Sequence, residues 1–212
     1  MALTLYYSPG ACSLAVHIAL QEAKAQYDRR LISVTEGQTQ SADYRRINPR
    51  GRVPALDVDG TILVETCAIL LYIARQYPDA RLLPAEPLRE AQCLSTMAWL
   101  ASTVHPAFAH VVKASRFSAQ EDALGGIRDV GLTTYWSALQ EIDAQIGAGP
   151  WLCGEQFSLS DAHALPFWGF GRFVRMPMDT LKNYTAWKDR MIRRPAVLEV
   201  LQIEDSRLLR TK

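Results

Sequence analysis

The chain has 212 residues, of which 49% are hydrophobic and 21% are charged, and its formal net charge is +1. This balance excludes the strongly basic surface that binds nucleic acids or anionic membranes, and no apolar run approaches the length of a bilayer. The N-terminus passes directly into "LTLYY" without the segments of a signal peptide, so we expect a cytoplasmic protein. The widely spaced cysteines, with no histidine at ligand spacing, predict neither a zinc site nor structural disulfides in a reducing compartment; they are Cys12, Cys67, Cys93 and Cys153.

The first 78 residues predict a compact α/β unit with a small sheet. Short β-branched and aromatic runs are typical of strands, whereas apolar residues that recur at helical spacing indicate helices. The expected elements are a strand at 3–7, a turn at 8–10, a helix at 11–22, a strand at 27–34, at most a short helix at 41–47, a hairpin of strands 53–58 and 61–64 around Asp59-Gly60, and a helix at 65–78.

The remainder of the chain carries few strand signals and predicts a bundle of helices. A proline-rich stretch at 79–88 has the composition of a linker. The expected helices are 89–116, 119–147, 158–175, 179–193 and a shorter one near 195–201. Within "FSLSDAH", Ser158 and Asp161 have the spacing of a capping box, which predicts a well-defined helix start.

Cys12 follows the predicted strand and the turn of Ser8, Pro9 and Gly10, which places it in the first turn of a helix. Unpaired backbone N–H groups at that position favour an anion and lower the pKa of a thiol. Ala15 stands where a dithiol oxidoreductase carries its second cysteine, so a reactive Cys12 needs a thiol from outside, and glutathione is the obvious cytosolic donor. The alternative is that Cys12 is a small buried residue in a helix packed on a sheet.

Two further segments have features of a binding site. A cis Val53–Pro54 bond would explain a proline at a strand start and would turn the Val53 N–H and C=O outward to an extended peptide; a trans proline on an edge strand is the alternative. Glu65 and Thr66 open a helix directly after a strand. Hydroxyl and N–H groups there fit a carboxylate and Glu65 fits an ammonium, whereas ordinary helix capping is the alternative.

His105 lies within a predicted helix, directly before the helix-distorting Pro106. A histidine that faces a pocket can hold a thiolate or donate a proton. The alternative is a core histidine on an apolar helix face, and the sequence around His105 leaves both open.

Taken together, five stretches resemble bacterial cytosolic glutathione S-transferases, closest to the beta class. They are "YYSPGACSLAVHIALQEA" (6–23), "INPRGRVPAL" (47–56), "VETCAILLYIA" (64–74), "VHPAF" (104–108) and "FSLSDA" (157–162). The resemblance covers essentially the whole chain. It implies a thioredoxin-like α/β N-terminal domain (1–78), a linker (79–88) and an all-α C-terminal domain (89–212), assembled as a homodimer. It also implies conjugation of glutathione to hydrophobic electrophiles without a metal.

The resemblance also implies roles for individual residues. Cys12 and His105 are the expected catalytic residues, and Cys12 would form a mixed disulfide with glutathione. The residues expected to bind glutathione are Cys12, Val53, Pro54, Glu65, Thr66 and His105, with Gln38 or Arg52 for the glycyl carboxylate. The residues expected to line the electrophile pocket are Tyr7, Ala11, Phe108, Phe167 and Phe170.

Two other functions stay open on the sequence. One is a glutathione-dependent thiol–disulfide oxidoreductase, in which a second glutathione resolves the mixed disulfide on Cys12. The other is a non-catalytic protein that binds glutathione or hydrophobic ligands. Such a protein would be free to lose Cys12 and the Glu65-Thr66 pair, and this chain keeps both.

Overall fold

The computed structural model describes residues 1–147 and 149–210. Its N-terminal domain is built on a four-stranded mixed sheet of order β2-β1-β3-β4. The strands are β1 (Leu3–Tyr7), β2 (Asp28–Leu31), β3 (Ala55–Val58) and β4 (Thr61–Val64). β1 runs parallel to β2 and antiparallel to β3, and β3 and β4 form the predicted hairpin. The expected α/β unit is therefore confirmed.

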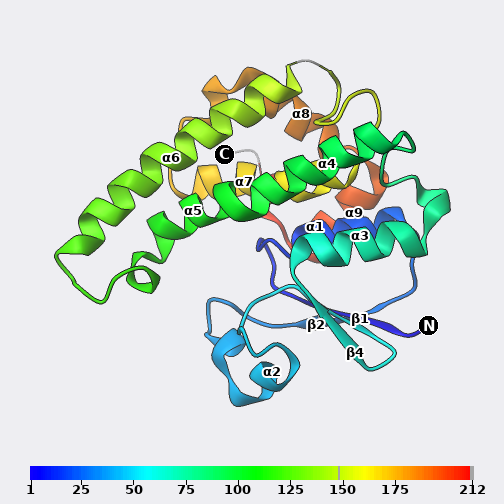
Figure 1. Cartoon of the computed structure of the whole chain (residues 1–212), viewed down its shortest axis with the longest axis horizontal. Helices are drawn as coiled ribbons and strands as arrows, with labels where there is room; N and C mark the ends of the chain where they lie inside the picture. The colour runs from blue at the N-terminus through cyan, green and yellow to red at the C-terminus, as the bar shows by residue number, and fades with distance from the viewer. Residues whose placement is uncertain (148, 211–212) are drawn as a thin grey trace.

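Three helices complete the N-terminal domain. Figure 1 shows α1 (Leu14–Glu22) and α3 (Thr66–Gln76) between the sheet and the helical domain, with the short α2 (Ala42–Ile47) away from that domain. Every residue from Leu14 to Leu20 is buried, including His17. The helix is buried on all sides because α3, α7 and α9 all pack against it.

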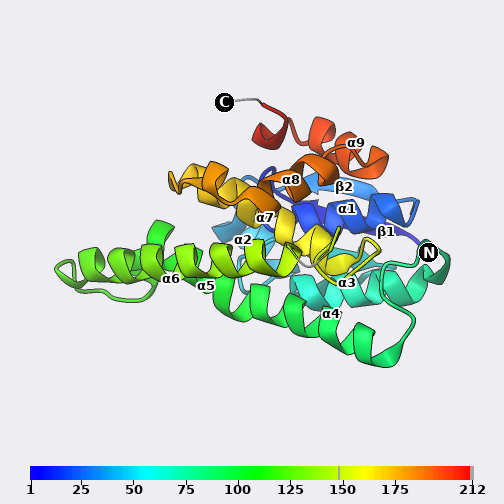
Figure 2. The ribbon, with the colours of Figure 1, turned by 90° about the horizontal axis from the view of Figure 1, so that it is seen from above.

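The C-terminal domain is built from helices. They are α4 (Pro87–Trp99), α5 (His105–Val112), α6 (Ala123–Ile146), α7 (Leu159–Phe173), α8 (Lys182–Met191) and α9 (Pro195–Ile203). Helix α7 contacts α1, α4, α6 and α8 and crosses the middle of the domain, as Figure 2 shows from above. None of the described helices is both long enough and apolar enough to cross a membrane.

The helix expected at 89–116 is interrupted by a π-helical turn at Leu100–Val104. This turn connects α4 to α5 directly before Pro106, which is the second residue of α5. Proline has no N–H, and its ring clashes with the carbonyl four residues earlier in a regular α-helix, so a wider turn at this point accommodates it. The π-helical turn also sets the direction in which the side chain of His105, the first residue of α5, points.

Candidate active site

Cys12 lies in the turn before α1 rather than in its first helical turn. Ser13 is the N-cap and Leu14 the first helical residue, so the predicted position of Cys12 was wrong. The Cys12 thiol donates a hydrogen bond of 3.3 Å to the carbonyl oxygen of Val53. The Val53–Pro54 bond is cis, as predicted. The Cys12 thiol thus occupies the Val53 carbonyl. Of the two polar backbone groups of Val53, the N–H is the one that has no hydrogen-bond partner within the described residues.

The Cys12 thiol is more basic than the sequence predicted. Burial raises its pKa to about 11, and the negative charge of Glu65 acts in the same direction. The Thr66 hydroxyl and the backbone N–H groups of Cys12 and Ser13 oppose this rise, since they donate to the sulfur. The expected lowering of the pKa was wrong because desolvation outweighs the donors at this turn. At neutral pH Cys12 is therefore a protonated thiol that acts as a hydrogen-bond donor.

Glu65 and Thr66 lie beside this thiol at the start of α3. Thr66 is the first residue of the helix and Glu65 is its N-cap, with a positive φ of 72°. A glutamate in this region of backbone space is uncommon and concentrates at functional sites. The Glu65 carboxylate accepts a hydrogen bond of 2.9 Å from Arg50, and both side chains are largely exposed.

The turn that carries Cys12 is fixed by residues close to it and far from it. The Ser13 hydroxyl accepts the Ser8 N–H and donates to the Ser8 carbonyl, each at 3.1 Å. From the other end of the chain, Glu204 accepts the Gly10 N–H at 3.1 Å. The second carboxylate oxygen of Glu204 lies 2.8 Å from Nδ1 of the buried His17. Sequence reasoning missed Glu204, because no local pattern marks a residue that meets its partners only in the folded chain.

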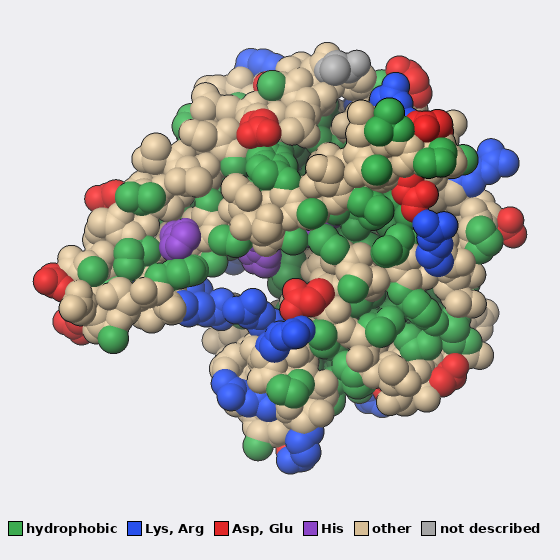
Figure 3. All heavy atoms as spheres, in the orientation of Figure 1, with side chains coloured by type: hydrophobic (Ala, Val, Ile, Leu, Met, Phe, Trp, Pro, Cys, Tyr) green, Lys and Arg blue, Asp and Glu red, His purple; other side chains and the backbone are tan. Residues whose placement is uncertain are grey.

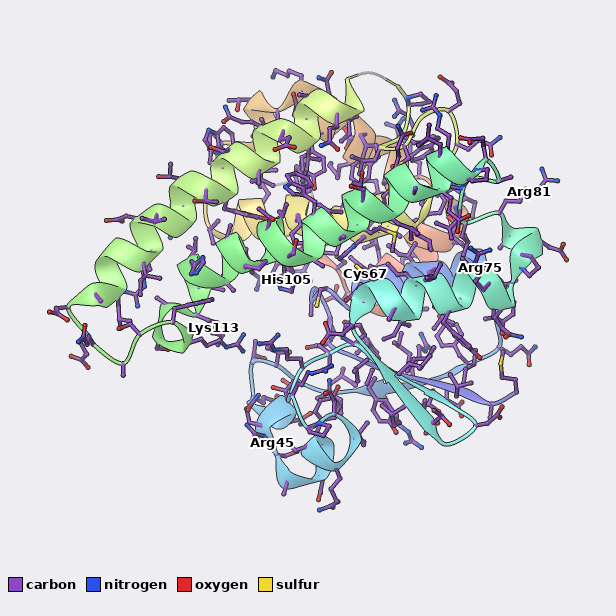
Figure 4. The ribbon with its side chains drawn as sticks, in the orientation of Figure 1. Arg45, Cys67, Arg75, Arg81, His105 and Lys113 are labelled. Atoms are coloured by element: carbon purple, nitrogen blue, oxygen red, sulfur yellow. The ribbon has the colours of Figure 1, made fainter. Side chains whose placement is uncertain are left out.

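His105 faces the N-terminal domain from the helical domain (Figure 4). Its ring is 5.8 Å from Phe167 and 6.1 Å from Phe170, measured between centroids. Phe170 stacks on Phe108 at 4.4 Å. Phe167 is completely buried, so it supports the His105 ring from behind rather than lining an open surface. Phe108 is only 9% exposed and belongs largely to the same aromatic core.

The charges around His105 are positive. Burial lowers the pKa of His105, and the guanidinium groups of Arg52 and Arg116 lower it further. Arg52 comes from the N-terminal domain and Arg116 follows α5, so the two domains converge on this ring. Figure 3 shows Lys and Arg side chains across the hollow between these domains, and Figure 4 places Lys113 at the same edge. Sequence reasoning missed Arg116 and Lys113. The lowered pKa keeps His105 neutral at pH 7, so it carries no positive charge there.

The remaining predicted residues have different surroundings. Gln38 is exposed, and its amide already accepts the Ser33 N–H at 2.8 Å and donates to Glu36 at 3.2 Å. Ala11 is half-buried in the turn before α1. Tyr7 is buried against His17, and burial and the charge of Glu204 raise its pKa, so it stays protonated. Within the described residues there is no cluster of three His, Cys, Asp or Glu side chains that could hold a metal ion.

The arrangement can bind a small molecule with peptide-like polar groups and keep a thiol at its centre. The Val53 N–H is free to donate to a peptide carbonyl, and opposite charges stand at Glu65 and Arg52. The Cys12 thiol is a donor and lies next to the Val53 carbonyl and Thr66.

Comparisons with known proteins agree with this geometry. Residues 1–75 match the family model "Glutathione S-transferase, N-terminal domain" and residues 132–195 match "Glutathione S-transferase, C-terminal domain". The chain is 29% identical over 205 residues to Glutathione S-transferase GstA of Escherichia coli O157:H7, covering 95% of this chain and 98% of that protein.

Solved structures give the same result. A glutathione transferase homologue from Sulfitobacter with bound glutathione superposes with a TM-score of 0.91 and 34% identity, covering 95% of this chain and 98% of that one. The beta-class glutathione S-transferase of Sphingomonas chungbukensis superposes with a TM-score of 0.83 and 32% identity over the same shares.

Proposed function

The chain belongs to the glutathione S-transferase family, and we propose that it conjugates glutathione to hydrophobic electrophiles between its two domains. One observation carries this proposal. Cys12, Val53, Glu65 and Thr66 come from three separate segments and meet around a single thiol. A binding-only descendant of the fold has no need to keep a protonated thiol in the company of these polar groups.

The two ends of glutathione fit opposite ends of the site. The γ-glutamyl carboxylate fits the Thr66 hydroxyl and the N–H groups at the start of α3, and its ammonium fits Glu65. The Val53 N–H fits the peptide carbonyl of the cysteinyl residue. For the glycyl carboxylate Arg52 is the better partner, because both polar atoms of the Gln38 amide already have partners. Arg52 forms no ion pair within the described residues.

The chemistry follows from the state of the Cys12 thiol. As a donor, it can leave the Val53 carbonyl and donate to the sulfur of bound glutathione, which favours the glutathione thiolate. That sulfur attacks the electrophilic carbon, a C–S bond forms, and the leaving group departs with its electron pair. The neutral His105 and the half-buried Ala11 and Phe170 border the place where the electrophile would lie. Tyr7 and Phe167 support that wall from the core.

The other features of the family are proposed on the same basis. We expect a homodimer in the cytoplasm, where glutathione is abundant and reduced. The proposed domains are residues 1–78 and 89–212, and the linker between them is 79–88. Sedimentation equilibrium of the purified chain tests the dimer.

Conjugation is tested with 1-chloro-2,4-dinitrobenzene, an activated aryl halide, as the electrophile. The wild-type chain is expected to form the conjugate at a rate that saturates with glutathione. Arg52→Gln is expected to raise the KM for glutathione at least about tenfold, because it removes a charge-assisted contact. Arg81→Gln is the matched control, since Figure 4 places Arg81 at the far end of α3. Binding to immobilised glutathione without any conjugate would contradict the proposal.

Thiol–disulfide exchange is the second candidate, and one observation favours it: Cys12 is half-buried and free. Exchange needs the thiolate, and the pKa of about 11 keeps the thiolate scarce at neutral pH. With oxidised glutathione, we expect one glutathione adduct by intact mass, absent in Cys12→Ser. Its rate should rise about tenfold per pH unit between neutral pH and the pKa. An adduct that forms equally fast at pH 7 and at higher pH would show that the thiol is already ionised.

A further inference from the structure

A second group of thiols lies outside the candidate active site, where α4 meets the start of α7. Cys93 of α4 is completely buried, and its thiol lies 3.5 Å from the Ser160 hydroxyl oxygen. Cys153, in the segment before α7, lies 3.0 Å from the same oxygen and is only partly buried. Ser158 completes the cluster, with its hydroxyl 2.7 Å from that of Ser160. Two sulfurs from distant parts of the sequence therefore contact one oxygen atom.

Because both thiols contact the one Ser160 oxygen, at 3.5 Å and 3.0 Å, their sulfurs also lie near each other. Interactions with Cys153, Ser160 and Ser158 lower the pKa of Cys93 to about 6 despite its burial. The pKa of Cys153 is raised instead, because its interaction with Cys93 favours the protonated form of the Cys153 thiol. The first proton leaves the pair more easily than it leaves an ordinary thiol, and the remaining thiol stays next to the thiolate. This is the state that a dithiol needs for oxidation.

We propose that Cys93 and Cys153 form an oxidation site that converts to an intramolecular disulfide with hydrogen peroxide as the oxidant. The Cys93 sulfur attacks one peroxide oxygen, the O–O bond breaks, and hydroxide leaves, which the proton first lost from the pair neutralises. The Cys153 sulfur then attacks the resulting sulfenic acid, the S–S bond forms, and water leaves with the Cys153 proton. Two thiols are oxidised and one peroxide is reduced to two water molecules.

The position of the pair gives the disulfide a structural consequence. The disulfide would join α4 to the segment before α7. The junction lies beside the Ser158–Asp161 capping box, which begins the helix that crosses the middle of the helical domain. This inference does not depend on glutathione binding, since neither cysteine takes part in the proposed conjugation.

The experiment uses the folded Cys12→Ser chain, in which the remaining cysteines are Cys67, Cys93 and Cys153. After treatment with hydrogen peroxide, the expected intact mass is lower by two hydrogen atoms, and non-reducing peptide mapping should join the peptides of Cys93 and Cys153. A dithiol should restore the original mass. Adding Cys93→Ser or Cys153→Ser should abolish the joined peptide.

The matched control is Cys67→Ser. Cys67 lies on α3 (Figure 4) and donates to the Met97 carbonyl at 3.4 Å, so it also lies beside α4. This variant should keep the joined peptide. A disulfide that includes Cys67, or a joined peptide formed only after unfolding in urea, would overturn the proposal. Peptide mapping of the parent Cys12→Ser chain decides the question even where a further variant fails to fold.

Discussion

Helices α1 and α7 are both buried and pack against each other, yet they begin in opposite ways. At the start of α7, side chains satisfy the backbone, because Asp161 accepts the Ser158 N–H at 2.9 Å in a capping box. At the start of α1, Ser13 has no capping hydrogen bond, since its hydroxyl closes the turn back to Ser8. The donors at the start of α1 therefore remain available to the sulfur of Cys12.

The two helices also differ in the histidine that each one buries. Nδ1 of His17 in α1 is paired with Glu204, whereas Nδ1 of His163 in α7 has no hydrogen-bond partner in the described structure. Nε2 of His17 has no such partner either. The start of α7 therefore serves the fold, whereas the start of α1 serves the candidate site. Substitutions at the two starts test this difference.

The largest expected effect is at the α7 start. Asp161→Ala removes the acceptor of the Leu152 N–H and the Trp187 indole N–H, each at 2.9 Å, as well as that of Ser158. Leaving these buried donors without a partner should lower the free energy of unfolding by about 3 kcal/mol or more. Urea denaturation measures it. The exposed Asp179→Ala should change the same quantity by less than about 0.5 kcal/mol, and an equal loss in both variants would contradict the assignment.

A smaller effect is expected from His163 and depends on pH. Burial lowers its pKa to about 3, with a further contribution from His105. Below about pH 6.5 the unfolded chain takes up a proton that the folded chain does not, so acid should favour unfolding until the pKa of the folded state is reached.

Between about pH 7 and about pH 5, His163→Leu should therefore lose less stability than the parent chain, by up to about 2 kcal/mol. Urea denaturation at the two pH values gives the difference. An equal loss in parent and variant would show that His163 takes up a proton in the folded state.

The smallest effects come from a matched pair of serines. Ser158→Ala and Ser13→Ala each remove two side-chain hydrogen bonds and should each cost about 1 to 2 kcal/mol. Only Ser13→Ala should also weaken glutathione binding severalfold, because it loosens the turn that carries Cys12. Isothermal titration calorimetry with glutathione separates the two variants. Equal affinities of the two variants for glutathione would mean that Ser13, like Ser158, stabilises the fold without shaping the binding site.

Local signals in the sequence were enough for much of this molecule. The hairpin, the capping box at Ser158 and the cis bond before Pro54 each depend on neighbouring residues, and all three were confirmed. The bounds of α1 were not predicted, because they depend on how the turn around Cys12 is held in the folded chain. The π-helical turn was not predicted either, although Pro106, which accounts for it, is a local signal.

The candidate site was predictable only in part. Cys12, Val53, Glu65 and Thr66 stand out from local pattern and resemblance, and the structure brings them together. The pKa of Cys12 was predicted in the wrong direction, since burial is a property of the folded chain. Glu204 was missed for the same reason, because it reaches Gly10 and His17 across the interface between the domains. Arg116 was missed because its approach to His105 depends on how the chain folds after α5.

The contact between Glu204 and Gly10 has a consequence for how the protein is made. The two residues are 194 positions apart, so Gly10 is synthesised long before Glu204. The sheet and α1 can form while synthesis continues, since N-terminal domains generally fold first. The turn that holds Cys12 can form its hydrogen bond from the Gly10 N–H to Glu204 only after the helical domain has been synthesised. A nascent chain that has not yet reached Glu204 lacks this hydrogen bond, so the turn around Cys12 is held less firmly until Glu204 has been added.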